Sequence, residues 1–132
     1  MGDISKNFSR REFECNPEKC GCGYNDIDLR VVAIAQAARD ALGESIRISS
    51  GCRCVSWNAN PEVRGVPGSW HTKGKAADLV CASGSKRLYE VLQALFKAGK
   101  IPALAYCKRY IKKNFVHIDV GARRSNRFTT GN

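Results

Sequence analysis

The chain has 132 residues, of which 43% are hydrophobic and 26% charged, and its formal net charge is +10. A chain of this length and composition fits one globular domain built around a single core, so we expect one domain over residues 1–132. No stretch approaches the roughly 18 apolar residues that a membrane-spanning helix requires, which excludes that class of protein.

The positive charge is concentrated near the C-terminal end. Residues 1–30 carry five basic and six acidic side chains, whereas residues 100–132 carry eight basic side chains against Asp119 alone. Such a field favours a polyanionic partner: nucleic acid, anionic lipid or an acidic cell-wall polymer. A solvated basic surface would explain it as well. Because the region carries no recognised nucleic-acid-binding motif, we predict that nucleic acid is not a partner.

The first elements are an irregular segment and a helix. Residues 1–24 are rich in cysteine, and Pro17 and a Cys-Gly-Cys-Gly run favour tight turns there. A helix then follows, capped by Asn25 or Asp26 and ended by Gly43. Its buried stripe is expected to comprise Ile27, Val31, Ile34, Ala38 and Leu42.

The middle of the chain predicts two strands, a loop and a second helix. Residues 45–49 alternate as in a short strand, and residues 76–81 form a buried strand. Residues 55–70, rich in proline, glycine, asparagine and serine, predict a long loop, which is often functional. A helix over 86–98 ends at Gly99. Its inward residues are expected to be Leu88, Leu92, Leu95 and Phe96.

Two further strands are expected near Pro102–Cys107 and over Phe115–Val120. Because strands and helices come in mixed order with short connections, we predict an α+β domain with a small antiparallel sheet and two main helices.

Seven cysteines are many for this length, and an odd number argues against a fully paired secreted scaffold. Cys81 and Cys107 lie in apolar runs and are expected in the core. The other five are closely spaced, and three alternatives stay open for them: a second, thiolate metal site, disulfides, or plain thiols. The spacing matches no standard zinc finger, which argues against the metal. These five are Cys15, Cys20, Cys22, Cys52 and Cys54.

The two histidines of the chain each lie close to an aspartate. His71 and Asp78 belong to Ser-Trp-His-Thr-Lys-Gly-Lys-Ala-Ala-Asp, in which Gly74 permits a bend between loop and strand. His117 lies in Phe-Val-His-Ile-Asp-Val-Gly, where a strand would place it on the same face as Asp119. The opposite, core-facing positions are Val116, Ile118 and Val120.

Two imidazoles and a carboxylate form a three-ligand set that leaves a fourth position open, as in catalytic zinc sites. Zinc in such a set activates water and polarises a scissile carbonyl. A lone histidine in a strand is more often a core residue, but both histidines here lie in acid-bearing, glycine-flanked segments. We therefore predict one zinc ion held by His71, Asp78 and His117.

The order of these motifs resembles the zinc D-Ala-D-Ala carboxypeptidases and the related cell-wall endopeptidases, which share the hedgehog/DD-peptidase fold. The resemblance rests on the motifs at 69–78 and 115–121, and on Ser-Ser-Gly-Cys-Arg at 49–53, which is similar to a Ser-Gly-Tyr-Arg segment of the family. Phe13-x-Cys15 and the Cys-Gly-Cys-Gly run at 20–23 resemble the N-terminal signature of one branch. The likeness extends over roughly residues 8–128 and implies the same three metal ligands.

The resemblance also implies that Arg53 holds a substrate carboxylate or the developing oxyanion, with Ser69 near the same group. A loop salt bridge is the alternative for Arg53. Many family members carry Glu or Asp three residues before the second histidine as general base, where this chain has Asn114. Because an amide cannot take that proton, Asp119 is the nearest replacement. Two roles stay open for it: general base, or orientation of His117. If Asp119 is not the general base, Glu62, the only carboxylate of the 55–70 loop, is the remaining candidate.

Together these features predict a zinc metallopeptidase, a carboxypeptidase or endopeptidase, that acts as a monomer on the peptide stems of bacterial peptidoglycan. The alternative is a metal-containing wall-binding module of the same fold without turnover, which Asn114 favours. The start of the chain has no apolar central region, so we expect no secretory signal. A phage lysin, cytoplasmic until the membrane is breached, then fits best, whereas a removed leader would imply a periplasmic or secreted enzyme. The residues do not specify which wall bond is cut.

Overall fold

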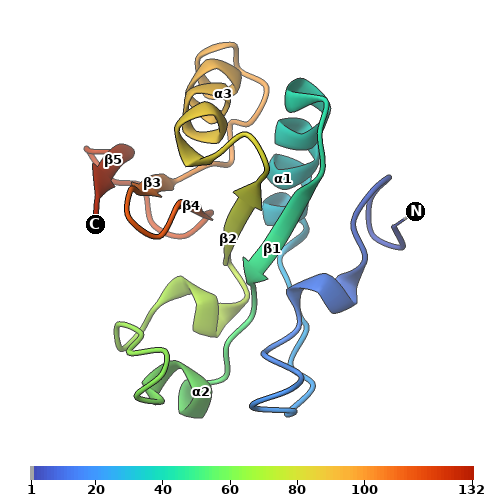
Figure 1. Ribbon diagram of the computed structural model, residues 1–132, viewed down its shortest axis with the longest axis vertical. Coiled ribbons are helices and arrows are strands. Elements are labelled where there is room, and N and C mark those ends of the chain that lie inside the picture. The colour runs from blue at the N-terminus through green and yellow to red at the C-terminus, as the bar shows by residue number, and fades with distance from the viewer. Residues whose placement is uncertain (1) are drawn as a thin grey trace.

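The computed structural model describes residues 2–132, which form a five-stranded sheet with helices packed against it (Figure 1). The strand order is β1-β2-β4-β3-β5, and all neighbouring strands are antiparallel except β3 and β5. The predicted α+β class with a small, mostly antiparallel sheet is confirmed. In chain order the elements are η1 (Arg10–Phe13), α1 (Leu29–Leu42), β1 (Ile46–Ser50), α2 (Val55–Ala59), η2 (Trp70–Lys73), β2 (Ala76–Cys81), α3 (Ser85–Lys97), β3 (Tyr106–Tyr110), β4 (Phe115–Asp119) and β5 (Phe128–Gly131).

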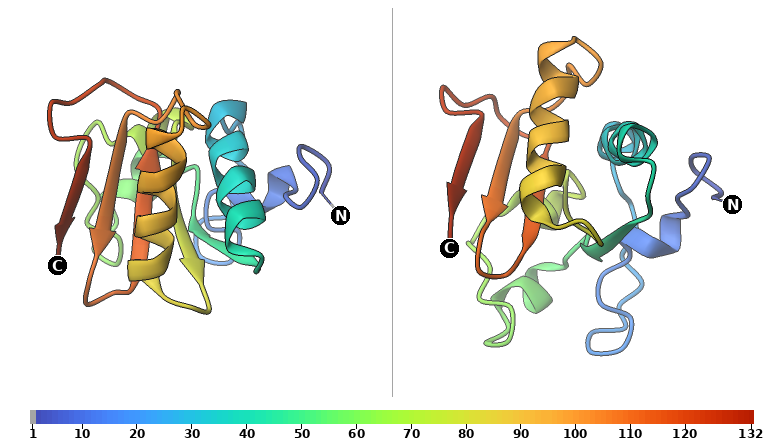
Figure 2. Two further views of the ribbon diagram at one scale, coloured as in Figure 1. Left: turned by 90° about the horizontal axis from the view of Figure 1, so that it is seen from above. Right: turned by 45° about the horizontal axis from the view of Figure 1, so that its top comes forward.

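The two long helices α1 and α3 lie side by side on one face of the sheet, where they contact each other and the central strands (Figure 2). The segment that carries α2 and η2 lies on the other side of the sheet from α3. The sheet therefore separates a helical core layer from a face built of loops and short turns. Functional side chains on its central strands can point only toward that second face.

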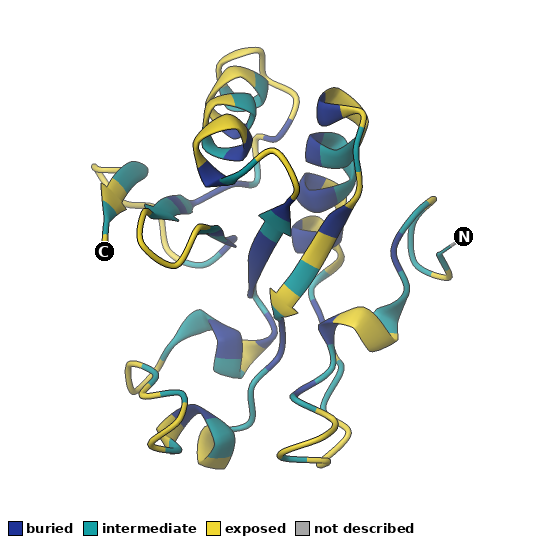
Figure 3. Ribbon diagram, viewed as in Figure 1, coloured by how far each residue is buried: buried dark blue, intermediate teal, exposed yellow. Residues whose placement is uncertain are grey.

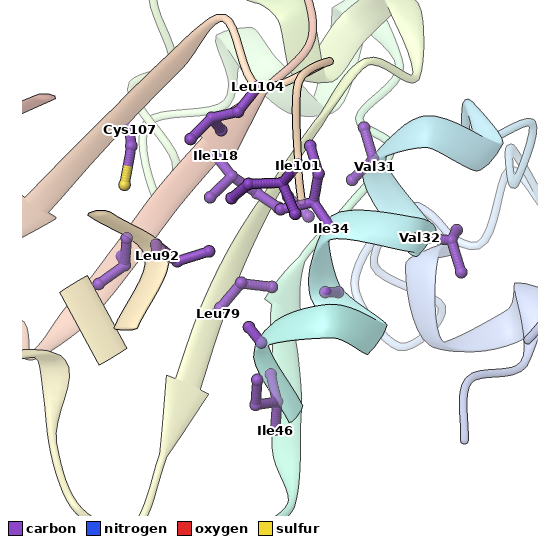
Figure 4. Close-up of a cluster of buried hydrophobic side chains, with 14 of the residues drawn as sticks. Val31, Val32, Ile34, Ile46, Leu79, Leu92, Ile101, Leu104, Cys107 and Ile118 are labelled. Carbon is purple, nitrogen blue, oxygen red and sulfur yellow. The ribbon is translucent and has the colours of Figure 1, made fainter. Parts of the chain in front are cut away.

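The hydrophobic core fills the space between the helices and the sheet. Ile34 of α1, Leu92 of α3, Leu79 of β2 and Ile118 of β4 meet there with almost no exposed surface (Figure 4). Both helices bury the side that faces the sheet and expose the other (Figure 3). Because burying one such side chain contributes about 1.5–3 kcal/mol, this layer anchors the two central strands. The expected buried residues Val31, Ile34, Ala38 and Leu42 of α1 and the core positions of Cys81 and Cys107 are confirmed, whereas Ile27 is buried but precedes the helix.

The first helix begins later than Asn25 or Asp26, so that predicted cap is wrong. Asp28 caps α1 instead: its side chain accepts the N–H of Arg30. The preceding residues are not helical, and the backbone N–H of Asp28 donates to the carbonyl oxygen of Gly74, which ties this segment to the turn before β2. Asp28 caps the helix and also pairs with the cationic side chain of Arg30. The pattern of apolar residues alone did not distinguish Asp28 from Asn25 or Asp26.

Three further boundaries differ from the sequence prediction. The expected loop at 55–70 contains the short helix α2, and η2 begins at Trp70. β3 runs over Tyr106–Tyr110 rather than 102–107, because Ile101 and Leu104 close a turn through the N–H of Leu104. No strand was expected after residue 120, yet β5 pairs in parallel with β3.

Candidate metal centre and active site

The three predicted metal ligands converge on the loop-covered face of the sheet. His71 lies in η2, Asp78 lies within β2 and His117 lies within β4. Asp78 and His117 are direct partners across the antiparallel pair. Asp78 Oδ1 lies 3.3 Å from His71 Nε2 and 3.1 Å from His117 Nδ1. One donor atom from each residue therefore lies within 4.8 Å of the other two.

Each imidazole is oriented by a contact to its other nitrogen. His71 Nδ1 lies 2.7 Å from the carbonyl oxygen of Gly51, which can only accept, so the proton sits on Nδ1 and Nε2 keeps its lone pair. His117 Nε2 lies 2.8 Å from Asp119 Oδ2, and donation to that carboxylate leaves the lone pair on Nδ1. Both histidines can therefore present an unprotonated nitrogen toward Asp78 once a cation replaces the protons between these groups.

The electrostatics of this cluster call for positive charge. Burial alone would lower the pKa of His117, but the hydrogen bonds and charges of Asp119 and Asp78 outweigh it and raise that pKa above its ordinary value. Burial alone would raise the pKa of Asp78, but His71 and His117 hold it well below its usual range. Without a cation, protons on the imidazoles must neutralise the carboxylates.

A divalent cation can replace those protons, and two imidazoles with one carboxylate form a donor set that zinc accepts. Two of the three ligands, His71 and Asp78, are more than 90% buried, as is Asp119, which contacts the third ligand His117. The residues therefore fit a catalytic zinc ion.

A pocket of about 470 Å³ opens over the three ligands. Five basic residues line it, whereas Asp78 and Asp119 are the only carboxylates among its lining residues. The pocket therefore presents a positively charged wall around the metal ligands. The five basic residues are Arg53, Arg64, Lys108, Lys113 and Arg124.

Arg53, to which the family resemblance gives a role in binding substrate, lies at the edge of the metal cluster. Its guanidinium donates from Nε to Ser50 Oγ at 2.9 Å, from Nη1 to Asn58 Oδ1 at 3.2 Å, and from Nη2 to Asp78 Oδ2 at 3.3 Å. The salt bridge expected as the alternative is therefore present, and its partner is a metal ligand. One residue thus both steadies Asp78 and presents a cation to the pocket.

Ser69 lines the same pocket and begins η2, where its Oγ accepts the backbone N–H of His71. This contact sets the direction of the turn that carries His71. Among residues 2–132 the Ser69 hydroxyl accepts this one hydrogen bond and donates none, so its proton is available to a molecule in the pocket.

Two glycines allow the backbone to approach closely beside the ligands. A Cβ on Gly51 would lie 2.6 Å from the carbonyl oxygen of Phe13, so only glycine places its own carbonyl against His71 here. A Cβ on Gly121 would lie 2.1 Å from the ring of Trp70, the neighbour of His71. Gly51 therefore brings its carbonyl oxygen against His71, and Gly121 leaves room for the Trp70 ring beside it.

Asp119 contacts His117 rather than projecting freely into the pocket. Its Oδ2 pairs with His117 Nε2 and its Oδ1 accepts the N–H of Gly121 at 3.2 Å. Of the two roles that the sequence left open, this contact favours orientation of His117. The other candidates for a base lie elsewhere: Asn114, in the turn between β3 and β4, accepts the backbone N–H of Ser85, and Glu62 pairs with the surface residue Lys19.

Sequence reasoning missed several residues of the site. Asn58 is buried and links Arg53 to the following loop, since its Nδ2 donates to the carbonyl oxygen of Val66. Tyr106 and Lys108 of β3 line the pocket. If the strand had been predicted over Tyr106–Tyr110, the alternation in Tyr-Cys-Lys-Arg-Tyr would have placed both residues on the face opposite the buried Cys107.

The cysteines also divide differently from the prediction. Cys52 is 1% exposed and packs in the hydrophobic core, so its grouping with the other four closely spaced cysteines is wrong. The remaining four form one group whose sulfur atoms all lie within 4.8 Å of one another, and we call it the four-cysteine cluster: Cys15, Cys20, Cys22 and Cys54.

Comparison with known families agrees with this site. A family model described as peptidase M15 matches residues 6–119, which include every ligand and Arg53. The chain belongs to the peptidase M15 family. This confirms the resemblance to zinc D-Ala-D-Ala carboxypeptidases and makes the protein a peptidase, a hydrolase with a peptide substrate. No individual curated protein matches the chain. Within residues 2–132, no helix has the length and apolar character to cross a membrane.

Proposed function

We propose that this M15 peptidase is zinc-dependent and hydrolyses peptide bonds in bacterial cell-wall peptidoglycan. One observation carries the proposal: donor atoms of His71, Asp78 and His117 converge at the floor of a pocket, each histidine with its other nitrogen already bonded. Such preset tautomers serve a metal, because only the unprotonated nitrogen binds one.

Zinc in this set supplies a Lewis acid that activates water and polarises the peptide carbonyl. The protein supplies the rest of the chemistry. Arg53, held by three hydrogen bonds, places a guanidinium beside Asp78 where negative charge develops on the carbonyl oxygen or where a substrate carboxylate docks. Ser69 adds a hydroxyl on the same pocket wall. Asp119 keeps the proton of His117 on Nε2 throughout.

The charge of the pocket supports a substrate that carries free carboxylates. Lys108 and Lys113 come from β3 and the turn after it, and Arg124 lies over the ring of Tyr106 at 4.0 Å. These cations surround a cavity in which the two carboxylates are already engaged with histidines. The stem peptides of the cell wall carry several carboxylates. A neutral peptide would leave the positive charge of the pocket lining uncompensated.

The test is digestion of purified peptidoglycan with the zinc-loaded protein, followed by identification of the released fragments by mass. We expect soluble fragments with new peptide termini, whose identity names the bond that is cut. His71→Ala should release none, and a chelator should abolish release until zinc is restored. Lys97→Ala, on the opposite helical face, is the matched control and should retain activity.

Binding without cleavage would instead favour the wall-binding module. In that case the zinc-loaded protein should sediment with peptidoglycan while no fragment is released. A single carboxylate beyond the ligands, itself bonded to His117, is the feature that favours this second reading. If the zinc-loaded protein neither binds nor cleaves peptidoglycan, the proposal of a cell-wall substrate is refuted.

The biological setting that we propose is a phage lysin that reaches the wall after the membrane is breached. Expression in a bacterial host tests it: lysis should follow only when the membrane is permeabilised. Lysis without permeabilisation would point to a protein that is exported by the host.

A further inference from the structure

The four-cysteine cluster lies on the loop-covered side of the sheet, outside the catalytic pocket. Three of its members belong to the N-terminal segment, and Cys54 directly follows Arg53. In Figure 1 the loop of this N-terminal segment and the segment leading into α2 both lie below the sheet. Residues far apart in the sequence thus bring their thiols together.

We propose that the four-cysteine cluster binds a second, structural zinc ion through four thiolates. The proposal rests on chemistry and geometry that the peptidase activity does not require. Four cysteines form the closed ligand set of structural zinc, with no position left for water.

The distances agree with this reading. Zinc–sulfur bonds of about 2.3 Å in a regular tetrahedron place neighbouring sulfurs about 3.8 Å apart. Cys20 Sγ lies 3.6 Å from Cys54 Sγ, and the largest separation within the cluster stays below 4.8 Å. A disulfide needs sulfurs about 2.05 Å apart and joins only two of them, whereas here all seven cysteines of the chain are free.

Backbone amides around the cluster point at its sulfurs. The N–H of Cys54 donates to Cys15 Sγ at 3.4 Å, and the N–H of Trp57 donates to Cys54 Sγ at 3.3 Å. Such bonds stabilise sulfur in its anionic form, and the bond from Trp57 lowers the pKa of Cys54. Burial raises the pKa of Cys15 to about 12, so this residue must release a proton when the metal binds.

The proposed ion would join the N-terminal segment to the active-site loop. Arg53 donates its backbone N–H to the carbonyl oxygen of His71, and Cys54 is the next residue. A metal on Cys54 would therefore hold the backbone of Arg53 in place without contacting substrate. Its loss should loosen this loop and leave the helices and the sheet folded.

The experiment measures zinc per chain in protein purified with reductant and free zinc, by elemental analysis. We expect about two zinc ions in the wild type. Cys22→Ser, at an exposed position, should lose one of them, and His117→Ala should lose the other. Cys81→Ser is the matched control: it removes a thiol outside the cluster and should keep both ions.

Cobalt provides a readout that separates the two sites. Thiolate ligands give cobalt an intense charge-transfer absorption that histidine and carboxylate ligands lack. We expect this absorption in the wild type and in His117→Ala, and its absence in Cys22→Ser. Because the His117→Ala result does not need a cysteine variant, it decides the matter even if Cys22→Ser fails to fold.

Two results would overturn the proposal. The first is a wild type with a single zinc ion that disappears in His117→Ala. The second is a Cys20–Cys54 disulfide, found by mass spectrometry in protein purified with reductant. Either can occur while peptidoglycan is still cleaved, so failure of this proposal is distinguishable from failure of the proposed function.

Discussion

His117 Nε2 lies 2.8 Å from Asp119 Oδ2, and both side chains project from β4 toward the pocket. This contact assigns the proton of His117 to Nε2 and leaves Nδ1 for a metal. The second oxygen of Asp119 accepts the N–H of Gly121, so the carboxylate is fixed at both ends. We therefore regard Asp119 as a residue that positions a ligand.

Asp119→Asn should weaken zinc binding more than it impairs the chemistry. An amide still contacts His117 but no longer attracts its proton, so metal affinity should fall by about ten- to a hundredfold. Activity should return at high zinc. The measurement is peptidoglycan release across a zinc titration, with metal content determined in parallel and Asp40→Asn as the control. Activity lost at full zinc occupancy would instead identify Asp119 as the general base, a role worth about a hundred- to ten-thousandfold in rate.

Arg53→Lys should retain zinc and lose catalytic efficiency. Lysine offers one point charge in place of the fork that contacts Ser50, Asn58 and Asp78. We expect kcat/KM at matched zinc occupancy to fall by about ten- to a hundredfold, less than the loss typical when an oxyanion donor is removed outright. Arg64→Lys is the control, since that arginine also lines the pocket but its guanidinium, among residues 2–132, donates only to the carbonyl oxygen of Pro61. Equal rates for the two variants would make Arg53 a structural residue.

Gly51→Ala should disturb both stability and metal binding. The added methyl group would meet the backbone of Phe13, which cannot move aside as a flexible side chain can. The resulting shift displaces the carbonyl that orients His71, and overpacking of this kind costs about 1–3 kcal/mol. Urea unfolding and zinc titration measure the two effects. Gly131→Ala should show neither, because its methyl group would meet only the flexible end of Lys108.

Asp28→Asn should alter stability in a pH-dependent way. The hydrogen bonds and charge of Arg30, aided by Lys75, hold the pKa of Asp28 well below its usual range. Because the folded-state pKa is depressed, the ionised carboxylate stabilises the fold above its unfolded pKa of about 4 and loses this contribution as pH falls below it.

The asparagine variant keeps the helix cap but not the charge. It should therefore be less stable than the wild type by about 1 kcal/mol or less at pH 7, and the gap should begin to narrow as pH falls below about 4 toward the depressed folded-state pKa. Parallel urea unfolding of both proteins at each pH gives the gap directly. A gap that does not change with pH would mean that the ion pairs of Asp28 contribute nothing to stability.

The metal ligands could be predicted from the sequence because zinc chemistry uses few residue types, and histidine occurs only twice in this chain. The alternation around His117 also placed Asp119 on the correct face. The helix patterns located α1 and α3, since burial against a sheet imposes a 3.6-residue period.

Other features depend on contacts that no local pattern carries. In the sequence, Asn58 is an ordinary residue of a predicted loop. Only the folded chain shows that its amide accepts a hydrogen bond from Arg53 and donates one to the carbonyl oxygen of Val66. β5 is a four-residue edge strand whose pairing with β3 is secured by packing of Phe128 against Tyr89 and Phe96. Likewise, only the folded chain separates Cys52 from the other closely spaced cysteines.

Two of the metal ligands lie on central strands of the sheet, whereas the third lies on a short turn. Asp78 and His117 stand on β2 and β4, each of which is paired with a strand on both sides. His71 stands on a short turn at the end of a long connection. Amide exchange should therefore distinguish them when metal is removed, with the central strands still protected and the turn around His71 exchanging faster. Metal binding would then order the turn that carries His71 against two ligands that the sheet already holds in place.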